Sequence, residues 1–425
     1  MHAPTIQAVR GMNDVLPDEA ALWERIEEAA RETFAQYGYR NLRVPIVEPT
    51  ALFVRGIGDA TDIVEKEMYT FDDHGESLTL RPEATAGIVR AAIEHNLIYE
   101  RAQRVWTAGP MFRHERPQKG RYRQFHQFDA EALGFAAADV DAEQIVMLAR
   151  LWKRLGLAGI SLSINSIGDP HERLAHRNAL AAYFQSKFDK LDESSKRRVN
   201  TNPLRILDSK NPEMQSIIAG APKLIDHLDA QSKSRQHFLE LQAMLKEADI
   251  VFEVNPRLVR GLDYYNRTVF EWITDRLGAQ GTVAGGGRYD FLFSQLGGDE
   301  TPACGFAVGV ERLALLLRDA GTQASAAPLA YVVHAGSGAT SAFARRVAEA
   351  LRDAALTVVV NSGGGNIKAQ MKRADASGAH WALIVGDDEA SANRVAAKPL
   401  RGAGAQIALA PEEVAAHIRA AAENT

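Results

Sequence analysis

Cysteine is almost absent from this chain of 425 residues, which contains only Cys304. A single thiol cannot form an internal disulfide and cannot supply the ligands of a cysteine-based zinc cluster. Such sparing use of cysteine fits a reducing compartment, so we expect a cytoplasmic protein.

Long apolar runs and a large excess of one charge are also missing. No stretch of about 18 apolar residues occurs, so we expect no membrane-spanning helix. The first residues, MHAPTIQAVRGMNDV, have no apolar core behind basic residues, so we expect no secretory signal. The net charge is −5. A small negative net charge does not indicate a nucleic-acid partner. It does not exclude one, because local patches of basic side chains matter more for binding than the net charge of the chain.

The pattern along the chain divides it into three parts. A chain of this length is too long for one core. Strand-like alternation is replaced by helical spacing from about residue 168 to about 248, and GTQASAAP at 321–328 is the clearest linker. We predict a mostly β domain at 1–325 with a helical insertion at about 168–248, and an α/β domain at 326–425.

Periodicity of the apolar residues predicts the individual elements. Helices are expected at 18–37, 82–93, 142–155, 310–317, 340–354, 367–375 and 411–421. Strands are expected at 42–46, 78–80, 104–112, 122–133, 160–164, 250–254, 268–272, 304–308, 330–333, 356–360, 381–385 and 405–408. Pro45 cannot donate to a β-ladder, so the first of these strands is either an ordinary edge or bends at a subunit contact.

The stretch 111–131, MFRHERPQKGRYRQFHQFDAE, reads as a basic hairpin with its turn at 117–120. After the turn, alternation places one set of side chains on a common face: Arg123, Phe125, Gln127, Asp129 and Glu131. Arg113 can lie near Gln127 across the hairpin. A cation, an amide and a carboxylate on one face suggest a binding floor, and the alternative is a solvated hairpin with cross-strand charge pairs.

Other charged and glycine-rich positions carry weaker signals. Glu83 follows a short strand and fits either a site or a routine acid at a helix N-terminus. Arg312 lies in the first turn of a helix, where a cation opposes the helix dipole, so an anion nearby is a reasonable suspicion. Three glycines in TVAGGGRYD (282–290) weaken a strand unless something approaches its backbone closely. The run 196–198, KRR, is either a solvated helix face or a nucleic-acid contact.

Separated motifs resemble those of one family. FRHERPQKGRYRQFHQ (112–127) and GFAVGVERLALLL (305–317) look like motifs 2 and 3 of the class II aminoacyl-tRNA synthetases, and 42–49 looks like motif 1, the dimer strand. RGLDYYNRTVFEW (260–272) and AGGGRYD (284–290) are similar to the two peptides peculiar to histidine-specific members. The chain thus resembles the bacterial-type histidyl-tRNA synthetases over nearly its whole length.

This resemblance implies a fold and an assembly. The class II fold is an α+β catalytic domain built on an antiparallel sheet. The family adds a helical insertion, a C-terminal α/β domain with a mostly parallel sheet that binds the anticodon, and a homodimer. Two departures from the family pattern are visible: Ala84 stands where glycine is frequent, and Phe291 where glycine is usual.

The implied activity is that of a histidine–tRNA ligase. The carboxylate of L-histidine attacks the α-phosphorus of ATP, giving histidyl-adenylate and pyrophosphate, and the terminal ribose hydroxyl of tRNA(His) then attacks the adenylate carbonyl. Because the carboxylate is already ionised at neutral pH, the first step needs alignment and charge neutralisation rather than a base. Mg²⁺ is expected with ATP, but no prosthetic group and no metal held by the protein.

Site residues are carried over from the family position by position. Arg113 and Arg260 are the implied catalytic residues, with Arg113 at the α-phosphate and Arg312 at the γ-phosphate. The implied histidine contacts are Glu83, Ala84, Thr85, Gln127, Glu131, Arg260, Tyr264 and Tyr265. Among them Glu131 would accept the imidazole N–H, and Tyr265 or the neighbouring Tyr264 would donate to the other ring nitrogen. Arg116 and Gln118 are the candidates that read the extra guanosine at the 5′ end of the tRNA.

Two other functions compete with this interpretation. A paralogue of these synthetases is a histidine-sensing regulatory subunit of ATP phosphoribosyltransferase, which typically lacks the C-terminal domain and parts of the ATP site. A nucleotide-dependent oxidoreductase could be inferred from the glycine clusters at 336–338 and 363–365, but their spacing fits neither a dinucleotide fingerprint nor a P-loop.

Overall fold

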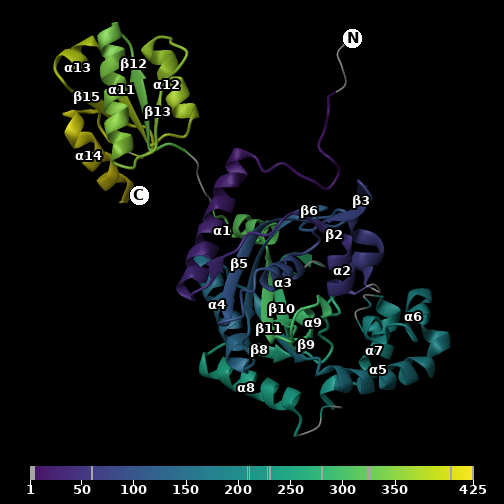
Figure 1. Ribbon diagram of the computed structural model, residues 1–425. Helices are drawn as coiled ribbons and strands as arrows, with labels where there is room; N and C mark the ends of the chain where they lie inside the picture. Colours follow the sequence, from purple (N-terminus) through teal and green to yellow (C-terminus); the bar gives the residue numbers. More distant parts are fainter. Residues whose placement is uncertain are drawn as a thin grey trace. The chain divides into compact units, whose positions relative to one another are not determined.

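The computed structural model describes residues 5–58, 61–207, 209, 211–226, 228, 231–278, 281–322, 327–402 and 404–423. The chain divides into two compact units, Met1–Ala324 and Ser325–Thr425 (Figure 1). The predicted linker contains residues 323–326, which lie outside the described part. Within the described part, no helix combines the length and the apolar character that crossing a membrane requires.

An eight-stranded sheet forms the centre of the first unit. Its strands, in spatial order, are β1 (Arg40–Asn41), β5 (Gln103–Phe112), β6 (Gln124–Leu133), β11 (Ala303–Gly309), β10 (Thr282–Arg288), β9 (Asn266–Ile273), β7 (Ser161–Ser166) and β8 (Phe252–Val254). The six central strands pair antiparallel, and the two edge strands pair parallel with their neighbours. The expected antiparallel sheet of the class II fold is therefore confirmed in its centre.

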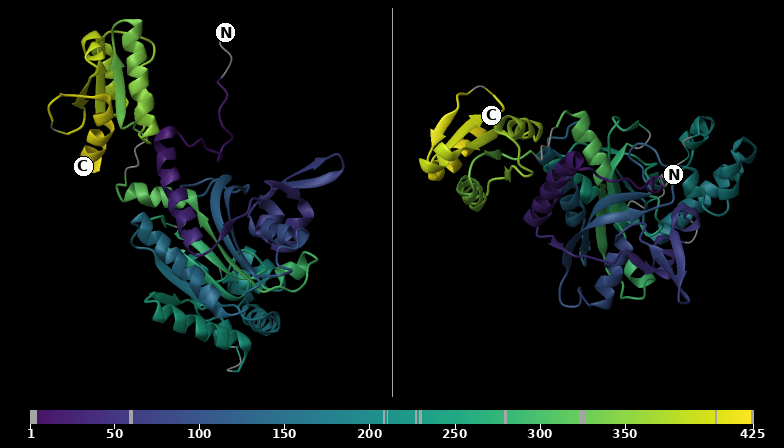
Figure 2. Two further views of the ribbon diagram at one scale, coloured as in Figure 1. Left: turned by 60° about the vertical axis from the view of Figure 1, so that its left-hand side comes forward. Right: turned by 90° about the horizontal axis from the view of Figure 1, so that it is seen from above.

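Helices cover both faces of this sheet. On one face lie α1 (Pro17–Gln36), α4 (Ala138–Leu155), α8 (Lys233–Glu247) and α10 (Val310–Asp319), whose apolar side chains share one core with the strands. Figure 2 shows α1, α4 and α8 along this face. The other face is covered by α3 (Thr85–Glu94) and α9 (Leu292–Gln295). Beside α3 lie α2 (Thr50–Ile57), the π-helical turn Ile63–Glu67 and a small sheet of β2 (Val47–Pro49), β4 (Glu76–Leu80) and β3 (Tyr69–Asp73).

A buried ion network ties the helices to the sheet. Asp141 in α4 accepts hydrogen bonds from Arg288 Nη2 at 2.6 Å and from Thr268 Oγ1 at 2.8 Å. Its Oδ2 also lies 2.5 Å from Nε2 of His237 in α8. Burial opposes ionisation of Asp141, but Arg288 and His237 outweigh that effect and hold the pKa of the carboxyl below its ordinary value. Arg288 of the AGGGRYD motif is therefore a buried structural residue that pairs with Asp141.

The only cysteine lies in the same core. The Cys304 thiol is fully buried and donates to Oε1 of Gln144 at 3.1 Å. Burial raises the pKa of this thiol well above its ordinary value.

Most of the predicted insertion forms a small helical body with its own apolar core. It contains α5 (Pro170–Gln185), α6 (Glu193–Arg198), α7 (Gln215–Ala219) and 3-10 turns at Phe188–Lys190, Pro203–Ile206 and Pro212–Met214. A further 3-10 turn, Leu224–Asp226, packs against the cores of the main sheet. A capping box in which Asp169 and Glu172 take part starts α5. The last helix of the predicted insertion, α8, instead covers the main sheet. Lys210, part of the predicted polar break, lies outside the described residues.

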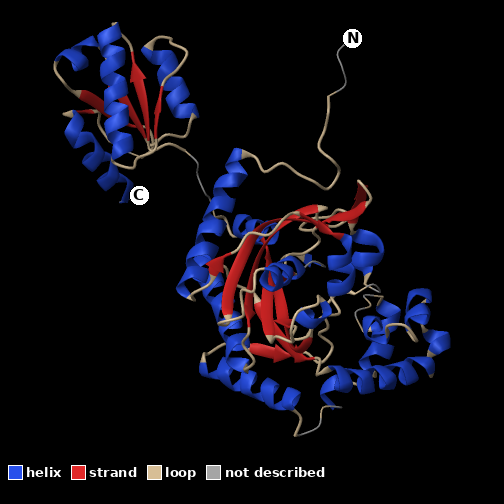
Figure 3. Cartoon of the chain, viewed as in Figure 1, coloured by secondary structure: helices blue, strands red, loops and turns tan. Residues whose placement is uncertain are grey.

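The second unit is a five-stranded sheet with helices on both faces, as Figure 3 shows. Its strands, in spatial order, are β13 (Val358–Val360), β12 (Ala330–His334), β14 (Trp381–Val385), β15 (Val395–Pro399) and β16 (Ile407–Leu409). The first three are parallel, as expected, and the last two add antiparallel pairings. Helices α11 (Gly338–Asp353) and α14 (Pro411–Glu423) cover one face, α12 (Ile367–Ala376) the other, and α13 (Asp387–Ser391) follows β14.

Several predicted bounds differ from the structure: α4 begins four residues before the predicted 142, and two further differences have a clear physical cause. The predicted strand at 42–46 is wrong: strand pairing stops at Asn41 and resumes at Val47. Pro45 has no N–H to donate, and the carbonyl of Val44 accepts instead from Nη1 of Arg81 at 3.1 Å. The helix expected from Pro82 begins at Thr85. Glu83 lies before the helix and accepts hydrogen bonds from its first backbone N–H groups.

Candidate functional site

A cavity of about 320 Å³ lies over the strands β6, β10 and β11, beside the start of α3. Eight of the residues proposed from the sequence line it: Glu83, Thr85, Arg113, Gln127, Arg260, Tyr264, Tyr265 and Arg312. Four others do not: Ala84, Arg116, Gln118 and Glu131. The fold therefore brings together side chains that lie up to 229 positions apart, from Glu83 to Arg312.

Four arginines line this cavity: Arg113, Arg121, Arg260 and Arg312. Burial lowers the pKa of Arg113, Arg121 and Arg312, and neighbouring arginines lower it further, to about 10 for Arg312. All remain cationic at neutral pH. Their mutual repulsion would be relieved by a ligand with several negative charges, so the geometry suits a polyphosphate.

Arg260 reaches the cavity by passing over the backbone of β10, the strand that contains Gly285, Gly286 and Gly287. Its guanidinium forms an ion pair with Glu271 of β9. A Cβ atom at Gly285 would lie 2.5 Å from Nη1 and 2.8 Å from Cζ of Arg260. Burial lowers the pKa of Arg260, but Glu271 outweighs this and leaves it above its ordinary value. One of the three glycines thus makes room for a side chain, as the sequence suggested for the run.

The other two glycines of the run make room for neighbouring strands. A Cβ at Gly286 would overlap with the backbone of β11, and one at Gly287 with the carbonyl of Thr268 in β9. The glycines therefore serve the sheet as well as the cavity.

Glu131 lies directly beneath the cavity and is fully buried. Thr85 Oγ1 donates to its Oε1 at 2.7 Å, and the Tyr289 hydroxyl donates to its Oε2. A Cβ at Gly305 would overlap with this carboxyl, so the glycine opposite Glu131 in β11 leaves the space that it fills. Burial raises the pKa of Glu131 well above its ordinary value.

Three tyrosines form a wall of the cavity. The Tyr264 ring lies 4.7 Å from that of Tyr265 and 5.6 Å from that of Tyr289, measured between centroids. Burial raises the pKa of all three hydroxyls, to about 12 for Tyr265. They are therefore neutral and able to donate hydrogen bonds at neutral pH.

Glu83 holds the start of α3. Its carboxylate accepts from the backbone N–H of Thr85 at 2.7 Å and of Ala86 at 2.9 Å. The structure thus gives it the capping role that the sequence left open, while the same side chain lines the cavity. Ala84 is fully buried beside it, with φ −105°, a value open to alanine as well as glycine. Phe291 likewise has φ −97° at the start of α9, outside the cavity lining.

The turn of the hairpin is exposed. Gln118 and Arg121 exchange backbone hydrogen bonds of 3.0 and 2.9 Å, so the turn closes one residue later than predicted. The side chains of Arg116 and Gln118 face solvent. Arg312 reaches the base of this turn and donates to the carbonyl of Gly120 at 3.1 Å.

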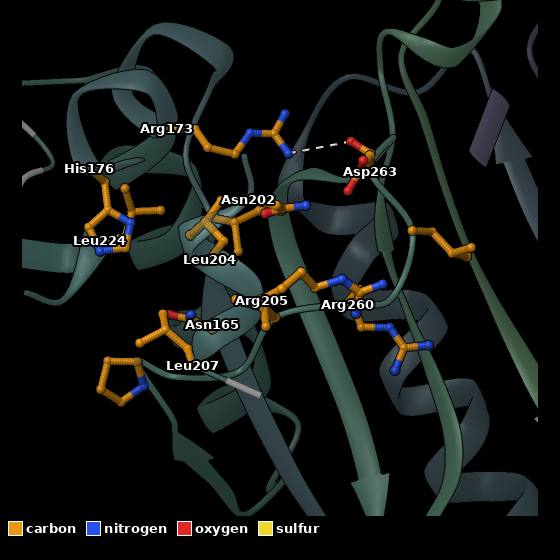
Figure 4. Close-up of a pocket in the computed structure, with 14 residues that line it drawn as sticks. Asn165, Arg173, His176, Asn202, Leu204, Arg205, Leu207, Leu224, Arg260 and Asp263 are labelled. Atoms are coloured by element: carbon orange, nitrogen blue, oxygen red, sulfur yellow. Dashed lines mark hydrogen bonds between the residues drawn. The ribbon is translucent and has the colours of Figure 1, made fainter. Parts of the chain in front are cut away.

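The helical insertion contacts the loop that carries Arg260 and the two tyrosines. Figure 4 shows Arg173 and Arg205 of the insertion around a pocket of about 50 Å³ that Arg260 also lines. Arg205 Nη2 donates to the carbonyl of Gly261 at 2.9 Å, and Arg173 Nη1 donates to that of Tyr265 at 2.6 Å. The insertion thereby fixes both ends of the segment 261–265.

Several cavity residues were missed from the sequence. Arg121, paired with Glu115, belongs to the basic hairpin, but it lies at the turn, before the strand alternation that begins at Arg123. Tyr289 lies within AGGGRYD, but its position next to Arg288 gives no local sign that its hydroxyl reaches Glu131. Glu271 had no local signal, because only the pairing of β9 with β10 brings it to Arg260.

Comparison with known proteins identifies the family. A family model described as histidyl-tRNA synthetase matches residues 11–313. The chain belongs to the histidyl-tRNA synthetase family. A second model, described as anticodon binding domain, matches residues 330–421.

Close relatives match almost end to end. A histidine–tRNA ligase of Nitrosomonas europaea is 61% identical over 405 residues, which are 95% of this chain and 96% of the relative. One of Dechloromonas aromatica is 59% identical over 415 residues, with coverage of 97% and 96%.

Solved structures show the same fold. The apo histidyl-tRNA synthetase of S. aureus matches with a TM-score of 0.80 and 32% identity, covering 98% of this chain and all of that one. A Bacillus halodurans chain described as an ATP phosphoribosyltransferase regulatory subunit/histidyl-tRNA synthetase matches at 20% identity with a TM-score of 0.65, covering 88% and 97%, which shows the fold alone. The high identity to ligases over the full length favours the enzyme over the regulatory alternative.

Proposed function

We propose that this chain attaches histidine to tRNA(His) in two steps. First, an oxygen of the histidine carboxylate forms a bond to the α-phosphorus of ATP, and the bond from that phosphorus to the β-phosphate bridging oxygen breaks, releasing pyrophosphate. Second, the oxygen of a terminal ribose hydroxyl of the tRNA forms an ester bond to the histidyl carbonyl carbon, the bond from that carbon to the phosphate oxygen of AMP breaks, and AMP and the hydroxyl proton are released. The observation that carries the proposal is one cavity lined by four arginines and by Thr85 and Tyr289, which donate hydrogen bonds to the carboxyl of Glu131 buried beneath it.

The arginines supply the charge that the first step requires. We assign Arg113 to the α-phosphate, Arg312 to the γ-phosphate and Arg260 to the reacting carboxylate and α-phosphate. A guanidinium binds two oxygens in a plane and stays ionised, so these side chains both align the reactants and neutralise charge moving toward pyrophosphate. ATP is expected with Mg²⁺ on its phosphates; within the described residues, no group of three or more His, Cys, Asp or Glu side chains could hold a metal ion.

The polar pocket suits the imidazole ring. A carboxylate offers about four acceptor positions, so Glu131 can keep its bonds from Thr85 and Tyr289 and still accept one N–H. Tyr264 or Tyr265 would donate to the other ring nitrogen. A ligand without these two nitrogens would leave buried polar groups unpaired, which costs affinity.

The remaining assignments concern the macromolecular partners. Arg116 and Gln118 are exposed at the turn of the hairpin, where a tRNA end can reach them. We propose 1–325 as the catalytic domain and 326–425 as the anticodon-binding domain. We also propose a cytoplasmic homodimer; the exposure of two apolar side chains, Ile46 and Val47, within the proposed dimer segment 42–49 supports this pairing.

Amino-acid-dependent exchange of pyrophosphate into ATP tests the proposal. The purified chain is assayed with each of the twenty amino acids in turn. Exchange with histidine alone is expected. Exchange with another amino acid, or with none, would refute the assignment, and charging of tRNA(His) transcripts then tests the second step.

A further inference from the structure

Asp129 is a buried carboxylate without an assigned role. It lies in β6 between Gln127 and Glu131, on the strand face that the alternation predicted, and it lines the cavity. Its side chain is 1% exposed, and its Oδ2 has no hydrogen-bond partner. An unpaired buried carboxylate is costly, so its presence in a cavity needs an explanation.

The charged groups around Asp129 are committed elsewhere. Arg81 donates to the carbonyls of Pro110 at 2.9 Å and Val44 at 3.1 Å. Arg113 donates through Nε to the carbonyl of Pro82 at 2.8 Å. Within the described residues, no ion pair joins either arginine to Asp129.

The neighbouring acids are also engaged. Glu83 accepts from the backbone of α3, and Glu131 accepts from Thr85 and Tyr289. Gln127, two residues before Asp129, is the exception, because its Oε1 is likewise buried without a partner. Two unsatisfied acceptors thus lie next to each other on one strand face and line one cavity.

Two adjacent acceptors, one of them a carboxyl group that becomes anionic when it releases its proton, match an ammonium group with its three donors. Resting on the function proposed above, we propose that Asp129 receives the α-ammonium group of histidine together with Gln127. Asp129 would then select an amino acid against the same molecule without its amino group. The selection follows because such an analogue leaves the carboxyl unpaired.

Proton uptake provides an independent signature. Burial, and then Glu83, raise the pKa of Asp129 to about 8, against the opposing effect of Arg81 and Arg113. Asp129 is therefore largely protonated in the empty cavity at neutral pH, and binding an ammonium there requires release of that proton. Histidine affinity should rise as the pH rises toward 8, more in the wild type than in a variant without this carboxyl.

The experiment compares histidine with 3-(imidazol-4-yl)propionate, which lacks the amino group. Isothermal titration of the full chain measures both ligands with the wild type, with Asp129→Asn and with Asp275→Asn, an exposed control. Asp129→Asn is expected to weaken histidine binding by roughly ten- to a hundredfold, the usual loss for a charged hydrogen bond, and to leave the analogue within about twofold. The pH-dependent rise should shrink in this variant.

Equal weakening of both ligands, or no weakening of histidine, would overturn the assignment. Retained binding of the analogue also shows that the variant is folded; if Asp129→Asn fails to fold, Asp129→Ser is measured in the same way. A wild type that binds no histidine would contradict the proposed function itself. If the wild type binds histidine and the Asp129→Asn variant prefers histidine over the analogue by the same factor, only the role of Asp129 is contradicted.

Discussion

Arg260 reaches the cavity only because position 285 has no side chain. The guanidinium lies across the backbone of β10, held by Glu271, and passes within contact of where a Cβ would be. The essential feature is therefore a pair of residues, one cationic and one without a side chain. This pairing predicts that a change at the glycine acts like a change at the arginine.

Gly285→Ala should displace the Arg260 guanidinium without removing any charge. Misplacement of a reacting group by about 1 Å can cost roughly a hundredfold in rate, so we expect a loss of that order in the histidine-dependent exchange rate. Gly338→Ala is the control, because a Cβ there meets nothing within 4 Å. A Gly285→Ala variant with near-normal exchange would contradict the geometric role of the glycine.

At the residue scale, local pattern predicted which strand face carries Gln127, Asp129 and Glu131, and eight proposed residues do line the cavity. It could not show that Glu131 lies beneath the floor, because that depth depends on Gly305 in a neighbouring strand. It also could not pair Arg260 with Glu271, since the contact arises only from the register between two strands. Alternation along a strand predicts the face on which a side chain lies, whereas the pairing of strands decides which side chains it contacts.

At the scale of elements, the buried ions around Asp141 join α4, α8 and the sheet. Arg288→Ala leaves Asp141 buried with less compensation, which typically costs about 3–5 kcal/mol. Urea unfolding followed by tryptophan fluorescence should show that loss in the free energy of unfolding. Arg31→Ala, at an exposed position, should change it by no more than about 0.5 kcal/mol. A similar small effect at Arg288 would show that the network is not structural.

The same network predicts how the free energy of unfolding changes as the pH falls. The pKa of Asp141 is depressed in the fold, so its contribution to stability is present above the ordinary aspartate pKa of about 3.9 and is lost as the pH falls. Arg288→Ala should lessen that loss. The free energy of unfolding measured between neutral and acidic pH, for both proteins, checks this sign.

The insertion also acts as an element, through Arg173 and Arg205. Arg205→Ala removes the bond to the carbonyl of Gly261 and should loosen the segment that carries Tyr264 and Tyr265. We expect about a tenfold rise in the KM for histidine, since a hydrogen bond from a charged donor is worth roughly that factor. Arg197→Ala, exposed in α6, is the control.

A second measurement separates positioning from simple loss of stability. Hydrogen exchange of residues 258–265 should become faster in Arg205→Ala, while exchange in the sheet should stay unchanged. Faster exchange throughout the unit would instead indicate global destabilisation.

The sequence predicted long elements well and interrupted ones poorly. The helix α1 and the strands β5 and β6 have sustained periodicity, and their predicted bounds lie within about two residues of the observed ones. The strand predicted around Pro45 is absent. Apolar residues alternate there, but proline has no backbone N–H for strand pairing. The strand β15, VAAKP, was missed because its alanines alternate with no polar residue until Lys398.

At the scale of the whole molecule, the two compact units predict separable activities. A chain ending at Pro328 keeps every described residue that lines the cavity. We expect it to lose most of its tRNA charging while retaining histidine-dependent pyrophosphate exchange within about tenfold, because the cavity proposed for activation is lined only by residues of the first unit. Equal losses in both assays would argue against anticodon binding by the second unit.

The buried thiol of Cys304 has a practical consequence. Reagents that label cysteine attack the thiolate, and this group is enclosed, hydrogen-bonded to Gln144 and held in its neutral form. The natural chain is therefore a ready background for spectroscopy. Cysteines placed at one exposed position in each unit would carry a donor and an acceptor dye without replacement of Cys304, and would report whether the distance between the two dyes depends on added tRNA.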